Sequence, residues 1–147
     1  MNRVGSILVV SAWLAFLACL ILPAVQLNTA EPYMGWLVGL AAIARIPEFY
    51  SDWTGLQVAM AGVGNIFIAL SPVALFYSGR RLYKFLALFF MGEFLIALSF
   101  YFGNYAQAAG YYLWVASFLV VSVGFGLLSR SVPYNNHLQR GAAPPHA

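Results

Sequence analysis

The sequence predicts an all-α integral membrane protein with four transmembrane helices, and three observations lead to this class. The chain of 147 residues is 63% hydrophobic and 7% charged, whereas soluble domains carry about 25% charged residues. Its apolar residues form long runs, and a helix of about 20 apolar residues is enough to cross a bilayer. A short turn between two of these runs, residues 79–84, holds three of the seven Lys and Arg residues. Basic turns of this kind are typical of the cytoplasmic side of a membrane.

The first span is expected at about residues 6–27, where an apolar run follows Arg3 and reaches Pro23. This run is longer than the apolar region of about 7–15 residues in a secretory signal peptide, so we expect it to remain as a membrane helix. Cys19 lies within the run and is the one cysteine in the chain. An intramolecular disulfide and a Cys-x-x-Cys metal or redox pair are therefore excluded.

The connection at residues 28–55 is expected to lie on the outer side. It contains an apolar piece, Trp36–Ala44, that is too short to cross the bilayer. We therefore expect a short interfacial or re-entrant helix between the first and second spans, ended by Pro47. Three of the four acidic residues also lie in this connection: Glu31, Glu48 and Asp52. They are interpreted as keeping an outer loop hydrated, with a shared cation on two of them as the alternative.

The second span is expected at about residues 56–77. Its small and polar residues recur at steps of three and four, which places them on one face of a helix. They are Gly62, Asn65, Ala69 and Pro72. A face of small residues allows close approach of two membrane helices, so we expect this face to pack against a neighbour.

The third span is expected at about residues 83–102 and the fourth at about 110–129. Gly110, Ser117 and Gly124 are seven residues apart in the fourth span. This spacing predicts a second seam of small residues for helix packing.

The distribution of charge predicts the topology. With four spans, six basic residues fall on one side of the membrane and Arg45 falls on the other. The six are Arg3, Arg80, Arg81, Lys84, Arg130 and Arg140. The positive-inside rule then places both termini in the cytoplasm, most simply at the inner membrane of a bacterium. Residues 1–130 are expected to form one four-helix bundle, followed by a flexible cytoplasmic tail at 131–147.

Glu93 is the one charged residue between Phe85 and Phe102, in the third span. It lies at about the same depth as Asn65 in the preceding antiparallel span, which predicts a hydrogen bond between the two side chains. An ionised carboxylate at this depth costs at least about 2.5–3.5 kcal/mol, so we expect a neutral acid or a carboxylate paired with a partner's basic residue. Three interpretations remain open: an interhelical hydrogen bond, a contact between subunits, and a site for proton or cation transport.

Aromatic residues are concentrated on the predicted outer side. Those that define this surface are Trp36, Tyr50, Trp53, Tyr101, Tyr105, Tyr111, Tyr112 and Trp114. One interpretation is an aromatic belt at the membrane–water boundary. The alternative is a binding surface for a protein partner, a lipid headgroup or a quinone-like ring.

The motifs of common enzymes are missing from the sequence. It has no Gly-x-Ser-x-Gly, no His-Glu-x-x-His and no phosphate-binding glycine loop. Both histidines, His137 and His146, lie outside the apolar runs, so no histidine within a span can ligate a haem or a metal. The basic residues form no extended run that suits nucleic acid. We therefore predict a non-enzymatic subunit or accessory protein with no resident cofactor, bound to other membrane subunits or to itself. The alternative is a small oligomeric transporter or channel that uses Glu93.

Overall fold

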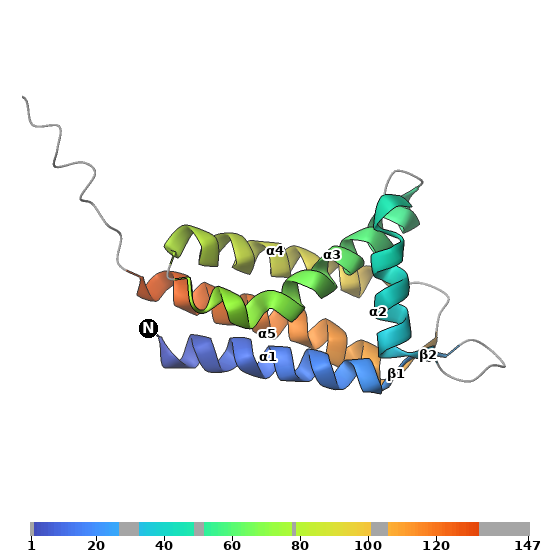
Figure 1. The fold of residues 1–147 in the computed structure, drawn as a ribbon, viewed down its shortest axis with the longest axis horizontal. Helices are drawn as coiled ribbons and strands as arrows, with labels where there is room; N and C mark the ends of the chain where they lie inside the picture. The colour runs from blue at the N-terminus through green and yellow to red at the C-terminus, as the bar shows by residue number, and fades with distance from the viewer. Residues whose placement is uncertain (1, 27–32, 49–51, 78, 101–105, 133–147) are drawn as a thin grey trace, which may run out of the picture.

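The computed structural model describes residues 2–26, 33–48, 52–77, 79–100 and 106–132, and these are mostly helical (Figure 1). The long helices are α1 (Arg3–Ile21), α3 (Trp53–Ala74), α4 (Arg80–Ser99) and α5 (Ala109–Ser131). A short helix, α2 (Gly35–Ala44), and a 3-10 turn, η1 (Ile46–Glu48), lie between α1 and α3. The short strands are β1 (Pro23–Gln26), β2 (Tyr33–Met34) and β3 (Ala106–Gln107).

The long helices run alternately up and down, so the bundle has two distinct ends (Figure 1). One end carries α2 and the strands, and we call it the α2 end. The opposite end, which we call the basic end, carries the first residues of α1 and α4 and the last residues of α3 and α5. Its basic residues are Arg3, Arg80, Arg81, Lys84 and Arg130.

Helix α5 lies between α1 and α4 and packs along both. Near the basic end, α1 and α5 approach closely through glycine. A Cβ atom on Gly124 would lie 2.8 Å from Cγ2 of Val9 and 3.0 Å from the carbonyl oxygen of Gly5. Conversely, a Cβ on Gly5 would lie 2.9 Å from the carbonyl oxygen of Gly124. Since neither position has room for a side chain, glycine permits this contact between the two backbones.

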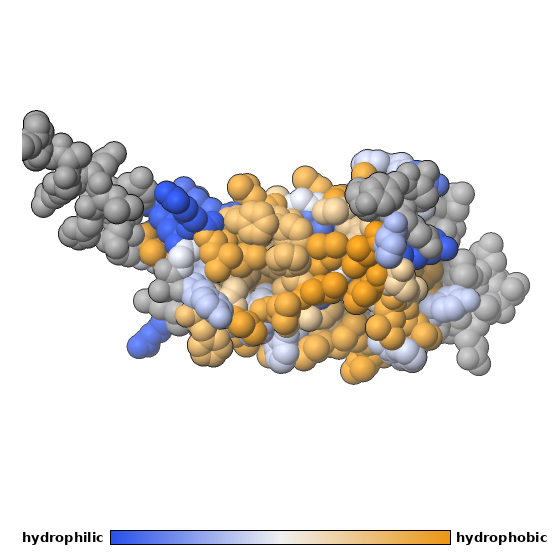
Figure 2. Space-filling view, turned by 45° about the horizontal axis from the view of Figure 1, so that its top comes forward, coloured by the Kyte–Doolittle hydropathy of each residue, from blue (hydrophilic) through white to orange (hydrophobic). Residues whose placement is uncertain are grey.

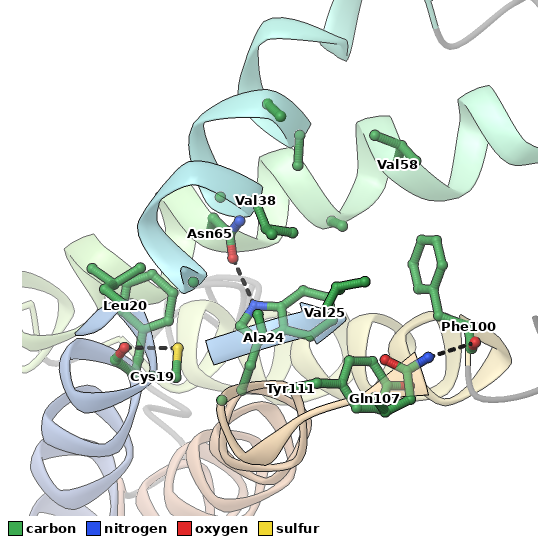
Figure 3. Close-up of a pocket in the computed structure, with 18 of the residues that line it drawn as sticks. Cys19, Leu20, Ala24, Val25, Val38, Val58, Asn65, Phe100, Gln107 and Tyr111 are labelled. Carbon is green, nitrogen blue, oxygen red and sulfur yellow. Dashed lines mark hydrogen bonds between the residues drawn. The ribbon is translucent and has the colours of Figure 1, made fainter. Parts of the chain in front are cut away.

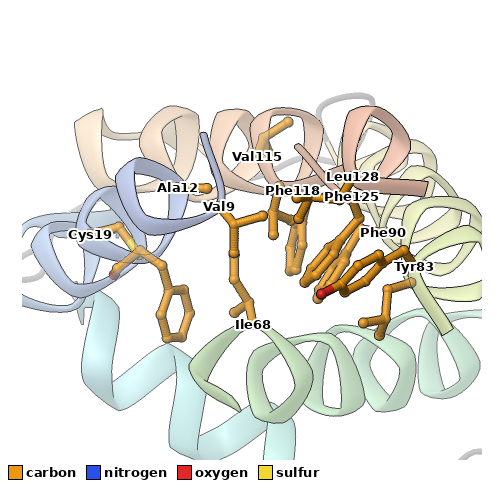
Figure 4. Packing of buried hydrophobic residues seen from close by; sticks show 14 of the residues in the cluster. Val9, Ala12, Cys19, Ile68, Tyr83, Phe90, Val115, Phe118, Phe125 and Leu128 are labelled. Carbon is orange, nitrogen blue, oxygen red and sulfur yellow. The ribbon is translucent and has the colours of Figure 1, made fainter. Parts of the chain in front are cut away.

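Stacked aromatic rings fill the core between α4 and α5 (Figure 4). Phe90 is fully buried, with its ring centroid 6.0 Å from that of Phe125 and 6.2 Å from that of Phe118. Tyr83 continues the stack, 5.8 Å from Phe125. These rings come from residues spaced by about two turns on each helix, so one face of α4 meets one face of α5 along most of its length.

Helix α3 leans away from the bundle towards the α2 end, and α2 stands across that end (Figure 1). The two helices meet at Gly62, where a Cβ would lie 2.6 Å from the carbonyl oxygen of Ala42 in α2. The start of α2 is held against α1 in the same way, because a Cβ on Gly35 would lie 2.0 Å from the carbonyl oxygen of Cys19. Helix α2 thus bridges α1 and α3 where these two long helices separate.

A three-stranded antiparallel sheet in the order β2-β1-β3 lies at the α2 end. Val25 of β1 pairs with Tyr33 on one side and with Gln107 on the other. The fold is mostly helical, as predicted, and this small sheet is an addition that the sequence analysis did not predict. The strands are too short for a pattern of alternating polarity to mark them in the sequence.

The observed helices differ from the predicted spans mainly at their ends. Helix α1 ends at Ile21 instead of about residue 27, because Leu22 is extended, as a residue before proline tends to be, and Pro23 starts β1. Helix α3 begins at Trp53, three residues early, because the side chain of Asp52 accepts a hydrogen bond from the backbone N–H of Gly55 at 2.6 Å. The short helix expected at 36–44 is present as α2.

The four long helices are each long and apolar enough to cross a membrane, whereas α2 is not. Apolar side chains cover the middle of the bundle, and hydrophilic side chains gather towards its two ends (Figure 2). These features indicate an integral membrane protein whose helices contact the lipid bilayer. The predicted tail, apart from its first two residues, lies outside the described residues.

Candidate functional site

Glu93 is enclosed within the bundle, with 1% of its surface exposed. It projects from α4 towards α3 and α5. The position of a Cβ on Gly64 would lie 2.7 Å from Glu93 Oε2 and 3.1 Å from Cζ of Phe118. The carboxyl group therefore occupies the space that a side chain at position 64 would need. Within the described part of the chain, neither carboxyl oxygen has a hydrogen-bond partner.

Asn65 does not form the predicted hydrogen bond with Glu93. Its Oδ1 accepts a hydrogen bond of 2.8 Å from Nε1 of Trp114 instead (Figure 3). The prediction matched the two residues by depth, but neighbouring residues on a helix point about 100° apart. At the level of Glu93 it is Gly64 that faces α4, while Asn65 faces α5 and α2.

Two buried hydroxyl groups also lack hydrogen-bond partners among the described residues. They are the Oγ of Ser71 in α3 and the phenol oxygen of Tyr83 in α4. Both belong to the part of the bundle nearer the basic end than Glu93. Buried polar groups without partners are costly and uncommon in folded proteins.

A cavity of about 390 Å³ lies at the α2 end (Figure 3). Its walls come from α1, α2, α3, α5 and the sheet. The main lining residues are Phe16, Leu20, Val38, Ala61, Phe100, Tyr111 and Trp114. The cavity exists because α3 and α1 separate here and the small residues of α2 do not fill the space between them. Its volume lies within the range of roughly 300–1,000 Å³ that small-molecule sites span in known proteins, and its walls are mostly apolar.

A few polar groups interrupt the apolar lining. The amide Nδ2 of Asn65 lies 3.6 Å from the position of a Cβ on Gly39, on the side of the cavity that α2 covers. Gln107 donates a hydrogen bond of 3.0 Å from Nε2 to the carbonyl oxygen of Phe100, and its Oε1 remains as an acceptor. Arg45 lines the cavity where α2 ends. Sparse polar groups within an apolar wall orient a bound molecule.

Glycines in the lining serve two different purposes. At Gly35 and Gly110 the backbone of another element takes the place of a side chain, because an added Cβ would lie 2.0 Å and 2.7 Å from a carbonyl oxygen. Gly39 is different, since its added Cβ would meet only ordinary contacts at 3.6 Å and 3.9 Å. The missing side chain of Gly39 thus leaves open space in the cavity.

The predicted aromatic surface divides into two groups. Trp36, Trp53 and Tyr112 are exposed. Tyr111 is buried and Trp114 is half-buried, and both line the cavity instead of the surface. The phenol of Tyr111 donates a hydrogen bond of 2.6 Å to the carbonyl oxygen of Ala97. Tyr50, Tyr101 and Tyr105 lie outside the described residues.

The predicted packing residues also have different surroundings. Gly62 packs against α2, Gly110 against the junction of α1 and β1, and Gly124 against α1. Ser117 is buried and bonds its own helix, with Oγ 2.6 Å from the carbonyl oxygen of Trp114. Ala69 is exposed, although its carbonyl oxygen accepts a hydrogen bond of 3.0 Å from Nε1 of Trp13. Pro72 is half-buried and lies within α3.

Four glycines that shape these features were missed by the sequence reasoning. Gly5, Gly35 and Gly64 take part in close approaches, and Gly39 opens the cavity. Gly64 had a usable signal: a long buried acid at the same depth needs a position without a side chain opposite to it. The other three had none, because a small residue in an apolar run is common whether or not it packs closely.

Comparisons with protein-family models, with curated proteins and with solved structures find no match to this chain.

Proposed function

We propose that this protein is a small non-enzymatic membrane protein that acts by binding at its α2 end. In this role it is an accessory subunit of a larger membrane complex or of a homo-oligomer. The observation that supports this proposal is the cavity of about 390 Å³ between α1, α2, α3 and α5. On α5, the residues that line the cavity include Trp114. Phe118, one turn further along the same helix, belongs to the packed core. This arrangement favours a binding pocket at one end over a path through the bundle.

We further propose that the basic end faces the cytoplasm, at the inner membrane of a bacterium. This orientation rests on the distribution of basic residues, because Arg45 is at the α2 end and five others are at the basic end. The five are Arg3, Arg80, Arg81, Lys84 and Arg130. The α2 end would then face the outer side. The test is labelling with a membrane-impermeant thiol reagent in intact cells, after Cys19→Ala removes the native thiol. Ser78→Cys should be protected and Thr54→Cys should be labelled. Labelling of Ser78→Cys alone would reverse the orientation.

Membership of a complex is tested by isolation in a gentle detergent, followed by measurement of the total mass and of the mass of each component. A stable partner or a homo-oligomer is the expected result. Isolation of the chain as a monomer at every detergent concentration, with its fold intact, would contradict the subunit role.

The second candidate function is proton or cation transport through Glu93. It is favoured by one observation: Glu93 is 1% exposed, and neither of its carboxyl oxygens has a hydrogen-bond partner in the described part of the chain. Intramembrane acids in such surroundings often carry protons or ions. Purified protein in liposomes should then give a proton flux that Glu93→Gln abolishes. No flux from protein that still assembles with its partner would support the accessory role instead.

A further inference from the structure

We propose that the cavity at the α2 end binds the ring of a lipid-soluble, quinone-like molecule, with a ring carbonyl oxygen accepting a hydrogen bond from Nδ2 of Asn65. This inference rests on the proposed binding function and names the ligand class for that site. Three observations support it: the orientation of the Asn65 amide, the unused donor of that amide, and the mostly apolar lining of the cavity.

The first observation concerns the orientation of the Asn65 amide. An indole N–H can only donate, so Trp114 must face the oxygen of the amide. The hydrogen bond of 2.8 Å from Trp114 Nε1 therefore turns Nδ2 away from α5 and towards Gly39 in α2. The structure presents an amide donor in a fixed direction, on the side of the cavity beneath α2 (Figure 3).

The second observation is that this donor is unused. Asn65 is 7% exposed, and its Nδ2 makes no hydrogen bond among the described residues. A donor in an apolar site is costly when it has no acceptor. A bound carbonyl oxygen would supply the acceptor, whereas a plain hydrocarbon chain would not.

The third observation is the character of the remaining wall. Phe16, Tyr111 and Trp114 offer aromatic rings, and most of the remaining lining is aliphatic side chains and glycine, with Arg45 and Gln107 as polar exceptions. A flat ring packs well against such walls, whereas a sugar or another strongly polar molecule would lose its hydration without replacement. The ligand that satisfies both the donor and the walls is an apolar ring with a carbonyl group. Such molecules dissolve in the bilayer, which surrounds the four long helices.

Gly39 allows the space itself to be tested. Gly39→Leu should place a side chain in the cavity, because a Cβ there has only ordinary contacts. Gly92→Leu is the matched control: it is also a glycine-to-leucine change within a helix, and nothing lies within 4 Å of its Cβ position. Asn65→Leu removes the donor at similar size.

The experiment measures binding of a decyl-substituted benzoquinone to the full chain in detergent micelles, from quenching of tryptophan fluorescence. Decylbenzene competes as the same chain on a ring without carbonyl groups, and a phosphatidylglycerol competes as an acyl ester lipid. We expect saturable quenching for wild type and Gly92→Leu, affinity about tenfold lower for Asn65→Leu, and no saturable quenching for Gly39→Leu. Neither competitor should displace the quinone at equal concentration. Melting temperatures identify any variant that does not fold.

Three outcomes would overturn the proposal: no saturable binding to wild type, equal binding to Gly39→Leu, or displacement by either competitor. Displacement by the phosphatidylglycerol would assign the cavity to lipid. If Asn65→Leu does not fold, the comparison of Gly39→Leu with Gly92→Leu still decides whether the cavity is the site. A partner recovered in gentle detergent together with no quinone binding would reject this ligand and leave the accessory role standing.

Discussion

The interior of the bundle is mostly apolar at both ends, but the two ends are packed in opposite ways. Near the basic end, Gly5 and Gly124 bring α1 and α5 into backbone contact, and rings such as Phe90 fill the space beside α4. At the α2 end, α3 leans away, α2 bridges the gap, and a cavity of about 390 Å³ remains. Apolar composition alone therefore does not determine whether a membrane bundle is densely packed. The packing density depends on where bulky and small residues face each other.

The largest expected effect is at the packed end. Phe90→Ala removes a fully buried ring that stacks on Phe118 and Phe125. The neighbours cannot close the space, so the free energy of unfolding should fall by about 3–5 kcal/mol. Titration with SDS from mild detergent measures this quantity. Leu88→Ala, at a position 74% exposed on the same helix, is the control and should change little. Equal effects of the two changes would remove the contrast between the packed end and the surface.

The next effect tests the glycine contact. Gly124→Val should lower the free energy of unfolding by about 1–3 kcal/mol, because its side chain would overlap α1, including backbone atoms that cannot move aside. Gly126→Val is on the same helix, two residues later, and has nothing within 4 Å of its Cβ position. The same titration should show a much smaller loss for this variant. A stable Gly124→Val protein would show that α1 and α5 are less closely packed than described.

The third prediction concerns Glu93, which lies between the two ends. Because both carboxyl oxygens lack partners in the described structure, Glu93→Leu should raise the free energy of unfolding, by about 1–3 kcal/mol. Glu93→Gln should be close to neutral, since the amide remains a buried polar group in the same place. An intrachain hydrogen bond to Glu93 predicts the opposite sign for leucine. Unfolding measurements on the two variants together would show which sign is right.

The smallest effect is expected within the cavity. Gly39→Ala should change the free energy of unfolding by less than about 1 kcal/mol, and in the stabilising direction, because alanine favours the helix and its Cβ has room. Gly35→Ala, in the same helix, should be destabilising, since its Cβ would lie 2.0 Å from the carbonyl oxygen of Cys19. Similar results for the two changes, again by SDS titration, would mean that α2 does not leave open space beside Gly39.

The sequence predicted the parts of this structure that depend on long patterns. Four apolar runs gave the four long helices, and an apolar piece too short to cross gave α2. The strands at Pro23–Gln26 and Ala106–Gln107 were not predicted, because their pairing joins distant segments and leaves no periodic signal. The end of α1 could have been placed better, since Leu22 precedes a proline.

The candidate site was predicted less well, for a geometric reason. Depth in the membrane can be counted along a helix, and it placed Glu93 and Asn65 at similar levels. The rotation of a helix about its axis cannot be determined from the sequence when the helix is apolar on all sides. The contact with Glu93 was therefore assigned to Asn65 instead of Gly64. The cavity was not foreseen, because it arises from the lean of α3. Trp114 and Asn65 were both singled out in the sequence, but for separate reasons, and their hydrogen bond joins them.

The order of the strands has a consequence for how the protein is made. β1 is synthesised first and lies in the middle of the sheet, while β3 is synthesised after α2, α3 and α4. The ribosome therefore completes most of the chain before the second edge of β1 can be covered. Helix α5 likewise emerges after α2, α3 and α4, although it packs along the length of α1. A nascent chain that contains only α1, α3 and α4 of the long helices thus has an unpaired edge on β1, and Gly5 of α1 lacks its contact with α5. Incompletely synthesised chains with such exposed surfaces are the species that cellular chaperones bind.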